Sequence, residues 1–78
     1  ILCKTEEDAN KILKIANKLG WQANNNTKYN KIDNGWIIDR DETCYSFYDG
    51  GRINIQDANK ERYIVHSVKW FLNKYKSI

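Results

Sequence analysis

The sequence contains no proline, one histidine, two cysteines and no long run of apolar residues. The absence of proline permits continuous strands and helices. Without a long apolar run there is no candidate membrane span, because a transmembrane helix needs about 20 mostly apolar residues. Cys3 and Cys44 are too few for a disulfide scaffold. We expect two reduced, partly buried thiols, and a single disulfide is the alternative if their strands are neighbours.

The same scarcity limits the chemistry that the chain can perform. One histidine, His66, and two cysteines far apart in the sequence do not complete a structural zinc site. Gly50 and Gly51 precede a predicted strand rather than a helix, so they do not form a phosphate-binding loop. Cys44 and His66 would suit a nucleophile and its base, but a core cysteine and a hydrogen-bonded histidine explain the same residues. The sequence therefore predicts no catalytic residues, no metal site, no cofactor and no enzymatic activity.

The chain has 78 residues and a formal net charge of +3, from 13 basic and 10 acidic side chains. This length corresponds to one domain, residues 1–78, with a thin core. The charge permits contact with nucleic acid or with an acidic protein. A dedicated DNA-binding protein, however, usually has a basic stripe and a higher pI. No signal-peptide pattern is visible, so we expect a cytoplasmic protein with no membrane partner.

A β-hairpin is predicted near the centre of the chain. Residues 43–48 alternate in character, so that Tyr45 faces the core and Tyr48 faces the other side of the sheet. Asp49-Gly50 predicts a type I′ turn, which requires positive φ angles, and residues 52–55 form the returning strand. Because aromatic rings fall on both sides, we expect one face of the sheet to serve another purpose, including self-association.

An amphipathic helix is predicted over residues 5–19. Thr5 is a typical N-cap, and acidic residues occupy the first turn, at the positive end of the helix dipole. Apolar residues recur at helical spacing and form one stripe. Gly20 follows as the residue that ends the helix.

The rest of the chain supplies further strands and a second helix. We predict strands at 28–32 and 36–39, which with the hairpin make an antiparallel meander. The C-terminal third has two interpretations. One is a single long helix. The other, which we favour, is a strand at 63–66 followed by a helix at 68–76 with Ser67 as its N-cap.

The predicted fold is therefore a single α+β domain. A small antiparallel β-sheet packs against an N-terminal helix and a C-terminal helix. Its predicted core joins apolar residues of both helices to the inner face of the sheet: Ile12, Leu13, Ala16, Leu19, Ile38, Tyr45, Phe47, Ile53, Val68, Phe71 and Leu72.

Several short motifs occur in a distinctive order. They are Lys4-Thr5-Glu6-Glu7, Leu19-Gly20-Trp21, residues 41–45 followed by Asp49-Gly50-Gly51, and residues 63–67 followed by Trp70-Phe71-Leu72-Asn73. This order resembles short phage- and prophage-encoded accessory proteins of low-GC bacteria. The chain differs from that group at residues 41–42, with Asp-Glu in place of Glu-Asn, and in residues 57–62.

The resemblance covers most of the chain, and it implies an accessory viral role without carrying over any catalytic residue. Proteins of this kind commonly inhibit or sequester a host enzyme or a defence protein. A composition rich in lysine, asparagine and isoleucine also fits an AT-rich viral genome.

Aromatic and guanidinium side chains near the ends of the hairpin form the candidate binding surface. These residue types dominate hot spots in protein interfaces and also stack on unpaired bases. The surface consists of Tyr29, Trp36, Arg40, Tyr48 and Arg52. The alternative, that the tryptophans and tyrosines are simply core, stays open.

Three functions are compatible with these features. The first is a non-enzymatic phage-type protein that binds and inhibits a host protein, such as a defence or replication factor, in the host cytoplasm. The second is a nucleic-acid-binding module, whose order of helix, three strands and long helix would match double-stranded-RNA-binding domains. The third is a homo-oligomer that sequesters a small ligand or nucleotide. We favour the first.

Overall fold

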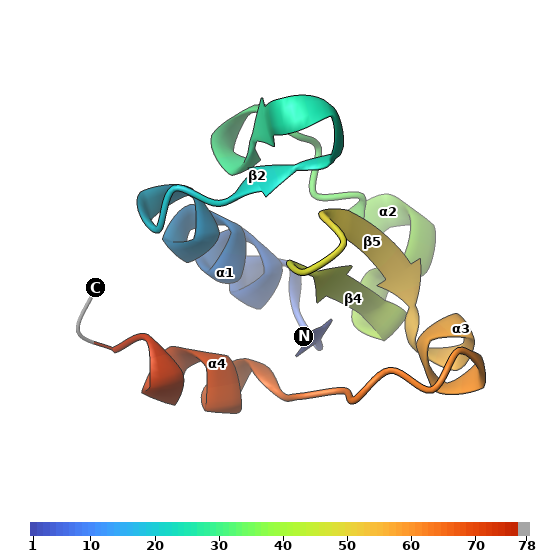
Figure 1. Ribbon diagram of the computed structural model, residues 1–78. Helices are drawn as coiled ribbons and strands as arrows, with labels where there is room; N and C mark the ends of the chain where they lie inside the picture. Colours follow the sequence, from blue (N-terminus) through green and yellow to red (C-terminus); the bar gives the residue numbers. More distant parts are fainter. Residues whose placement is uncertain (77–78) are drawn as a thin grey trace.

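Two terminal helices and a short antiparallel sheet enclose the core in the computed structural model, which describes residues 1–76 (Figure 1). This confirms the predicted α+β class. The helices are α1 (Glu6–Lys18), α2 (Trp36–Asp39), α3 (Ile55–Lys60) and α4 (Val68–Lys74). The strands are β1 (Leu2–Cys3), β2 (Gln22–Ala23), β3 (Thr27–Lys28), β4 (Thr43–Ser46) and β5 (Gly51–Asn54).

Helix α1 forms as its sequence predicts. The Thr5 side chain accepts a hydrogen bond from the amide of Asp8 at 3.1 Å, which satisfies one of the free amides of the first turn. Gly20, just beyond the helix, has φ +81°, a conformation that costs glycine little. The buried stripe of α1 consists of Ala9, Ile12, Leu13 and Ala16.

The main sheet has the order β1-β4-β5, with both pairs antiparallel. In the β1–β4 pair, Leu2 lies opposite Cys44 and Cys3 lies opposite Thr43. The two cysteines are therefore neighbours across adjacent strands but point to opposite faces of the sheet, because side chains alternate along a strand. Both thiols are free.

The predicted hairpin forms, but β4 ends two residues earlier and β5 begins one residue earlier than predicted. Ser46 pairs with Gly51, which leaves the four-residue loop 47–50. The Gly50 amide donates to the Ser46 carbonyl at 2.8 Å, and Gly50 has φ +74°. Asp49 has no positive φ, so the predicted type I′ turn is wrong. The left-handed conformation falls on glycine alone, and the Asp49 amide instead bonds the Ser46 hydroxyl at 3.3 Å.

The predicted strand at 36–39 is wrong, because these residues form α2. The Asn34 side chain accepts a hydrogen bond from the amide of Trp36 at 2.9 Å and so starts a helical turn. Ile37 and Ile38 are 78% and 66% exposed, so Ile38 does not belong to the core. A local hydrogen bond thus overrides the strand preference of a short apolar run.

The predicted strand at 28–32 is also largely wrong. Only Lys28 belongs to a strand, β3, which pairs with β2 in a separate two-stranded sheet. Residues Tyr29–Lys31 form a 3-10 turn instead. The asparagine run Asn24–Asn26 makes the tight connection between β2 and β3, and Asn25 and Asn26 have φ +66° and +58°.

In the C-terminal third, the predicted helix is confirmed and the predicted strand is wrong. The Ser67 hydroxyl caps α4 by accepting from the Trp70 amide at 3.1 Å. Residues 63–66 form no strand, and the parallel bridge in this region lies just after them, between Leu2 and Ser67. The cause is the length of β1, which at two residues offers almost no partner for a further strand.

The alternative of one long C-terminal helix is excluded as well. Helix α3 ends at Lys60, and Arg62 then adopts φ +65°. The order of helix, three strands and long helix that would match a double-stranded-RNA-binding domain is therefore not formed by residues 1–76.

The core lies between α1, α4 and the inner face of the sheet. Six predicted members are buried: Ile12, Leu13, Ala16, Tyr45, Val68 and Phe71. Phe47 and Leu72 pack against them at partial exposure. Cys3, Ala9 and Tyr29 are also buried there. The burial of Cys3 agrees with the expected buried thiol, and that of Tyr29 with the alternative that the tyrosines belong to the core. Among the described residues, no helix has the length and apolar character needed to cross a lipid bilayer.

Candidate functional site: an aromatic groove

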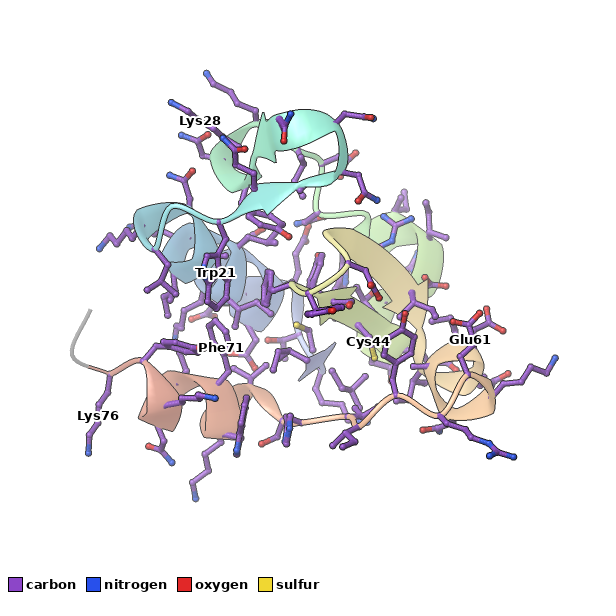
Figure 2. All side chains as sticks on the ribbon, in the orientation of Figure 1. Trp21, Lys28, Cys44, Glu61, Phe71 and Lys76 are labelled. Carbon is purple, nitrogen blue, oxygen red and sulfur yellow. The ribbon has the colours of Figure 1, made fainter. Side chains whose placement is uncertain are left out.

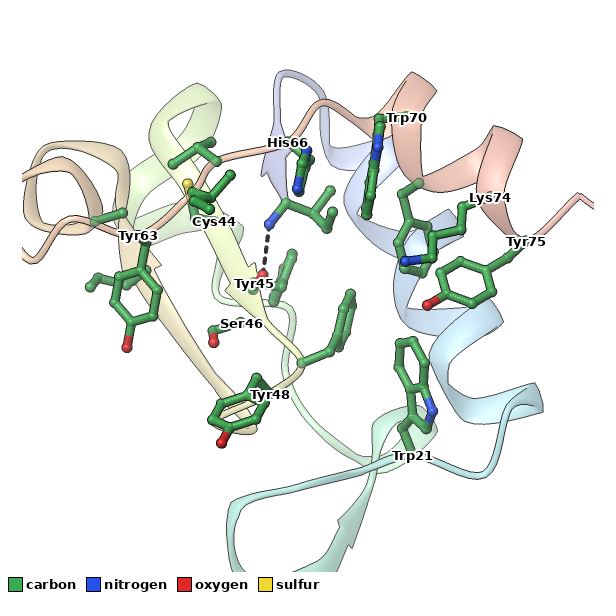
Figure 3. A pocket seen from close by; sticks show the side chains of 17 residues that line it. Trp21, Cys44, Tyr45, Ser46, Tyr48, Tyr63, His66, Trp70, Lys74 and Tyr75 are labelled. Carbon is green, nitrogen blue, oxygen red and sulfur yellow. Dashed lines mark hydrogen bonds between the residues drawn. The ribbon is translucent and has the colours of Figure 1, made fainter.

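An open groove of about 610 Å³ lies between the β4–β5 hairpin and α4 (Figure 3). We call it the aromatic groove. The hairpin side includes Cys44, Tyr45, Ser46, Phe47, Tyr48 and Ile53. The C-terminal side includes Tyr63, Ile64, Val65, His66, Trp70, Phe71, Lys74 and Tyr75, and Trp21, Ile1 and Ala58 complete the lining.

A cluster of rings joins the hairpin, the residue before β2 and α4 beneath this groove. The rings of Trp21 and Phe47 have centroids 5.4 Å apart, and those of Phe47 and Phe71 are 5.5 Å apart. Trp21 meets Phe71 and Tyr75 edge to face, at 6.3 and 5.4 Å (Figure 2 shows Trp21 and Phe71 facing each other). Such pairs add about 0.5–1.5 kcal/mol each beyond area burial. The cluster fixes α4 relative to the hairpin and hence the width of the groove.

The α4 side of the groove carries a stacked pair and a lysine. The rings of His66 and Trp70 are 3.7 Å apart and inclined by 8°. The Lys74 ammonium lies 4.9 Å from the Trp70 ring centroid and 5.9 Å from that of Tyr75. These are cation–π distances, and Lys74 itself is exposed. This side therefore presents flat aromatic surface next to a positive charge.

The hairpin side is held by a polar cluster. The hydroxyls of Ser46 and Tyr63 both donate to the carboxylate of Asp49, the former at 3.1 Å. The bond to Asp49 raises the pKa of the Tyr63 hydroxyl. Tyr63 follows α3, so these bonds tie the hairpin loop to the segment that leads to α4. Tyr48, in the same loop, makes no such bond and is 99% exposed.

The lining contains little that would perform chemistry. Burial raises the pKa of the Cys44 thiol, so Cys44 is protonated at neutral pH and is a poor nucleophile. The His66 ring is stacked on Trp70. Within residues 1–76, no three histidine, cysteine or carboxylate side chains converge as metal ligands. The geometry suits binding through aromatic surface.

The structure separates the five residues of the predicted surface. Tyr48 lines the aromatic groove, whereas the other four do not. Tyr29 is buried in the core, where its ring meets Phe47, and Trp36 packs against the core from α2. Arg40 is exposed after α2, with φ +49°. The guanidinium of Arg52 packs against Gly35.

Eight of the 17 groove residues come from the C-terminal segment, and none of them was in the predicted binding surface. One signal was present. In the predicted helix at 68–76, Val68, Phe71, Leu72 and Tyr75 recur at helical spacing on one face, and Trp70 falls outside it. A tryptophan off the buried face of an amphipathic helix indicates exposed aromatic surface. In the structure Trp70 is 39% exposed.

Comparison with known proteins identifies no family: no family model matches the chain, and no curated protein or solved structure matches it significantly.

Proposed function

We propose that the protein is a non-enzymatic, phage-type accessory protein that binds a host protein through the aromatic groove and inhibits it in the host cytoplasm. The observation that carries the proposal is the exposed apolar rim. Tyr48 is 99% exposed, Ile64 is 84% exposed, and Tyr63 and Trp70 are partly exposed beside them. Aromatic side chains around an apolar hollow are the usual anchors of a protein interface.

Two further observations support the proposal. The thiol and imidazole in the lining are a protonated, buried cysteine and a stacked histidine, which favours binding over catalysis. The motif order that resembles phage accessory proteins includes residues 63–67 and Trp70-Phe71-Leu72-Asn73, and these supply much of the C-terminal side of the groove. An inhibitor needs only to block a functional surface of its target. A protein that holds part of that surface in its aromatic groove would block it.

Affinity capture with matched variants tests this function. Tagged protein is incubated with lysate of a low-GC bacterium, and the captured proteins are compared between the native chain and Tyr48→Ser/Trp70→Ala. Ile37→Ser is the control, because Ile37 is exposed but does not line the groove. Arg40→Ala tests the separate contribution of the sequence-predicted surface.

We expect one host protein to be retained by the native chain and by Ile37→Ser and to be lost with the double variant. The purified host protein should also lose activity when an equimolar amount of this protein is added. Capture of no specific protein, or capture without loss of activity, would contradict the proposed function.

A second candidate is sequestration of a small ligand or nucleotide by an oligomer. The size of the groove favours it, because ligand pockets span about 300–1,000 Å³ and this one is about 610 Å³. Native mass spectrometry distinguishes the two functions. An oligomer that carries a bound small molecule supports sequestration, and a ligand-free monomer supports the protein-binding role.

A further inference from the structure

The C-terminal side of the groove comes from a segment that carries positive charge only. From Arg62 to Lys76 the chain has four basic residues, Arg62, Lys69, Lys74 and Lys76, and no aspartate or glutamate. This segment forms the whole C-terminal side of the groove. On the hairpin side, Asp49 already accepts hydrogen bonds from Ser46 and Tyr63. A ligand in the groove therefore meets apolar rings together with a positive potential from α4.

We propose that the aromatic groove receives a segment of the partner protein in which an aromatic or long aliphatic side chain lies next to an aspartate or glutamate. The apolar side chain packs over Phe47 and Phe71, and the carboxylate lies at the ammonium of Lys74. The proposal rests on the proposed function as a protein-binding inhibitor, and it names the chemistry of the bound segment.

Lys74 is the residue that selects the charge of the ligand. It is the one lysine or arginine among the groove residues in the part of the chain that the structure describes. Its ammonium lies over Trp70 and Tyr75, so its charge is held beside apolar surface. A carboxylate at this point reaches the ammonium while its neighbouring side chain is buried, whereas a basic partner would be repelled.

A nucleic acid fits the same surface less well. A single strand is bound by stacking along a groove whose cations track the phosphates. Among residues 1–76, Lys74 is the one lysine or arginine of the groove, so no row of basic side chains follows the path of a strand. The arrangement favours one apolar side chain with one nearby negative charge.

Short capped peptides titrated into the ¹⁵N-labelled protein test this inference. The acidic probe has phenylalanine and leucine flanked by aspartate and glutamate. One matched probe carries asparagine and glutamine in place of the acids, and another carries lysines. A last probe keeps the acids and has alanine in place of the apolar residues. The indole N–H signals of Trp21 and Trp70 report on the groove, and that of Trp36, which does not line it, is the internal control.

We expect the acidic apolar probe to shift the signals of Trp21 and Trp70 and not that of Trp36. The neutral probe should bind about threefold more weakly, as is typical for loss of one exposed ion pair, and the basic probe more weakly still. The alanine probe should cause no shift of either indole, because charge alone does not fill an apolar groove.

Substitutions on α4 complete the test. Lys74→Gln should equalise the affinities of the acidic and neutral probes, and Lys74→Glu should make the basic probe the tighter one. Lys69→Glu makes the same charge change on the same helix outside the groove and should keep the native order. Both lysines are exposed, so the variants are expected to fold.

Several outcomes would overturn the inference. They are equal binding of the acidic and neutral probes, equal shifts of all three indoles, or the same effect from Lys69→Glu as from Lys74→Glu. Tighter binding of a uridine oligonucleotide than of the acidic probe would assign the groove to nucleic acid instead. These probes need no host protein. Selective probe binding without host capture would therefore refute the inhibitor function and leave the proposed groove chemistry standing. Host capture that is unaffected by Lys74→Glu would support the inhibitor function and refute the proposed groove chemistry.

Discussion

The imidazole of His66 lies flat on the indole of Trp70, with ring centroids 3.7 Å apart. His66 is in the irregular segment before α4, and Trp70 is in its first turn. The stack therefore joins two parts of the chain that helix hydrogen bonds do not connect. It also fixes the orientation of the partly exposed indole at the edge of the aromatic groove.

Loss of this stack should weaken both the fold and the groove. We expect His66→Ala to lower the free energy of unfolding by about 0.5–1.5 kcal/mol, the usual contribution of an aromatic pair. His66→Phe keeps a flat ring and should restore most of the loss. Urea unfolding monitored by circular dichroism measures both variants. Equal destabilisation by alanine and phenylalanine would show that the ring contact contributes little.

Thr43 offers a stabilising substitution. It is fully buried in β4, and its hydroxyl oxygen has no hydrogen-bond partner among the described residues. A buried hydroxyl without a partner carries a desolvation cost, so Thr43→Val should raise the free energy of unfolding by about 1 kcal/mol. Thr43→Ser keeps the hydroxyl, removes a buried methyl group and should destabilise instead. A lower midpoint for the valine variant in chemical denaturation would contradict this expectation.

Gly35 is predicted to accept a side chain only if the Arg52 guanidinium moves away. It has φ +68°, and a Cβ built there would lie 1.2 Å from a guanidinium nitrogen of Arg52. Gly35→Ala should therefore destabilise by about 1–2 kcal/mol, from left-handed strain and from displacement of the flexible Arg52 guanidinium. Gly20→Ala is the matched control. It has φ +81° but open space around the Cβ, so it should cost only about 1 kcal/mol. In an Arg52→Ala background, the excess cost at Gly35 should largely disappear.

Stability should fall in alkaline solution because of Cys3. Burial raises the pKa of the Cys3 thiol from its ordinary 9.0 to about 12. Above pH 9 the unfolded chain releases this proton while the folded chain retains it, so stability is full below pH 9 and declines from about pH 9 to 12. Denaturation midpoints measured across this range should fall more steeply for the native chain than for Cys3→Ala. Parallel slopes would refute the assignment to Cys3.

The elements that the sequence predicted correctly are those whose signals are local. Thr5, Gly20 and Ser67 mark helix ends, and each does so through a contact within a few residues. The hairpin also follows from its alternating pattern. These features depend little on the rest of the chain, so propensity and periodicity suffice to place them.

The errors arise where a distant contact, or one that competes with the local pattern, determines the secondary structure. Residues 36–39 have strand-forming side chains, but the hydrogen bond from the Trp36 amide to the Asn34 side chain starts a helical turn instead. Residues 63–66 lack a partner strand because β1 is so short. The groove is harder still to predict, since its surface depends on how Trp21, the hairpin and α4 meet. The predicted binding surface contributes Tyr48 to the groove, and the position of Trp70 outside the apolar face was a further signal.

Because the groove is assembled from the start of β2, the hairpin and α4, it exists only while the chain is folded. Any ligand that fills it therefore stabilises the folded state, since it binds the native state and not the unfolded one. At a free concentration one hundred times its dissociation constant, such a ligand adds about 2.7 kcal/mol to the free energy of unfolding. For a domain of this size, such an increment corresponds to a rise in melting temperature of roughly 10–20 °C. The melting temperature is thus a readout by which unidentified binding partners of the groove can be screened.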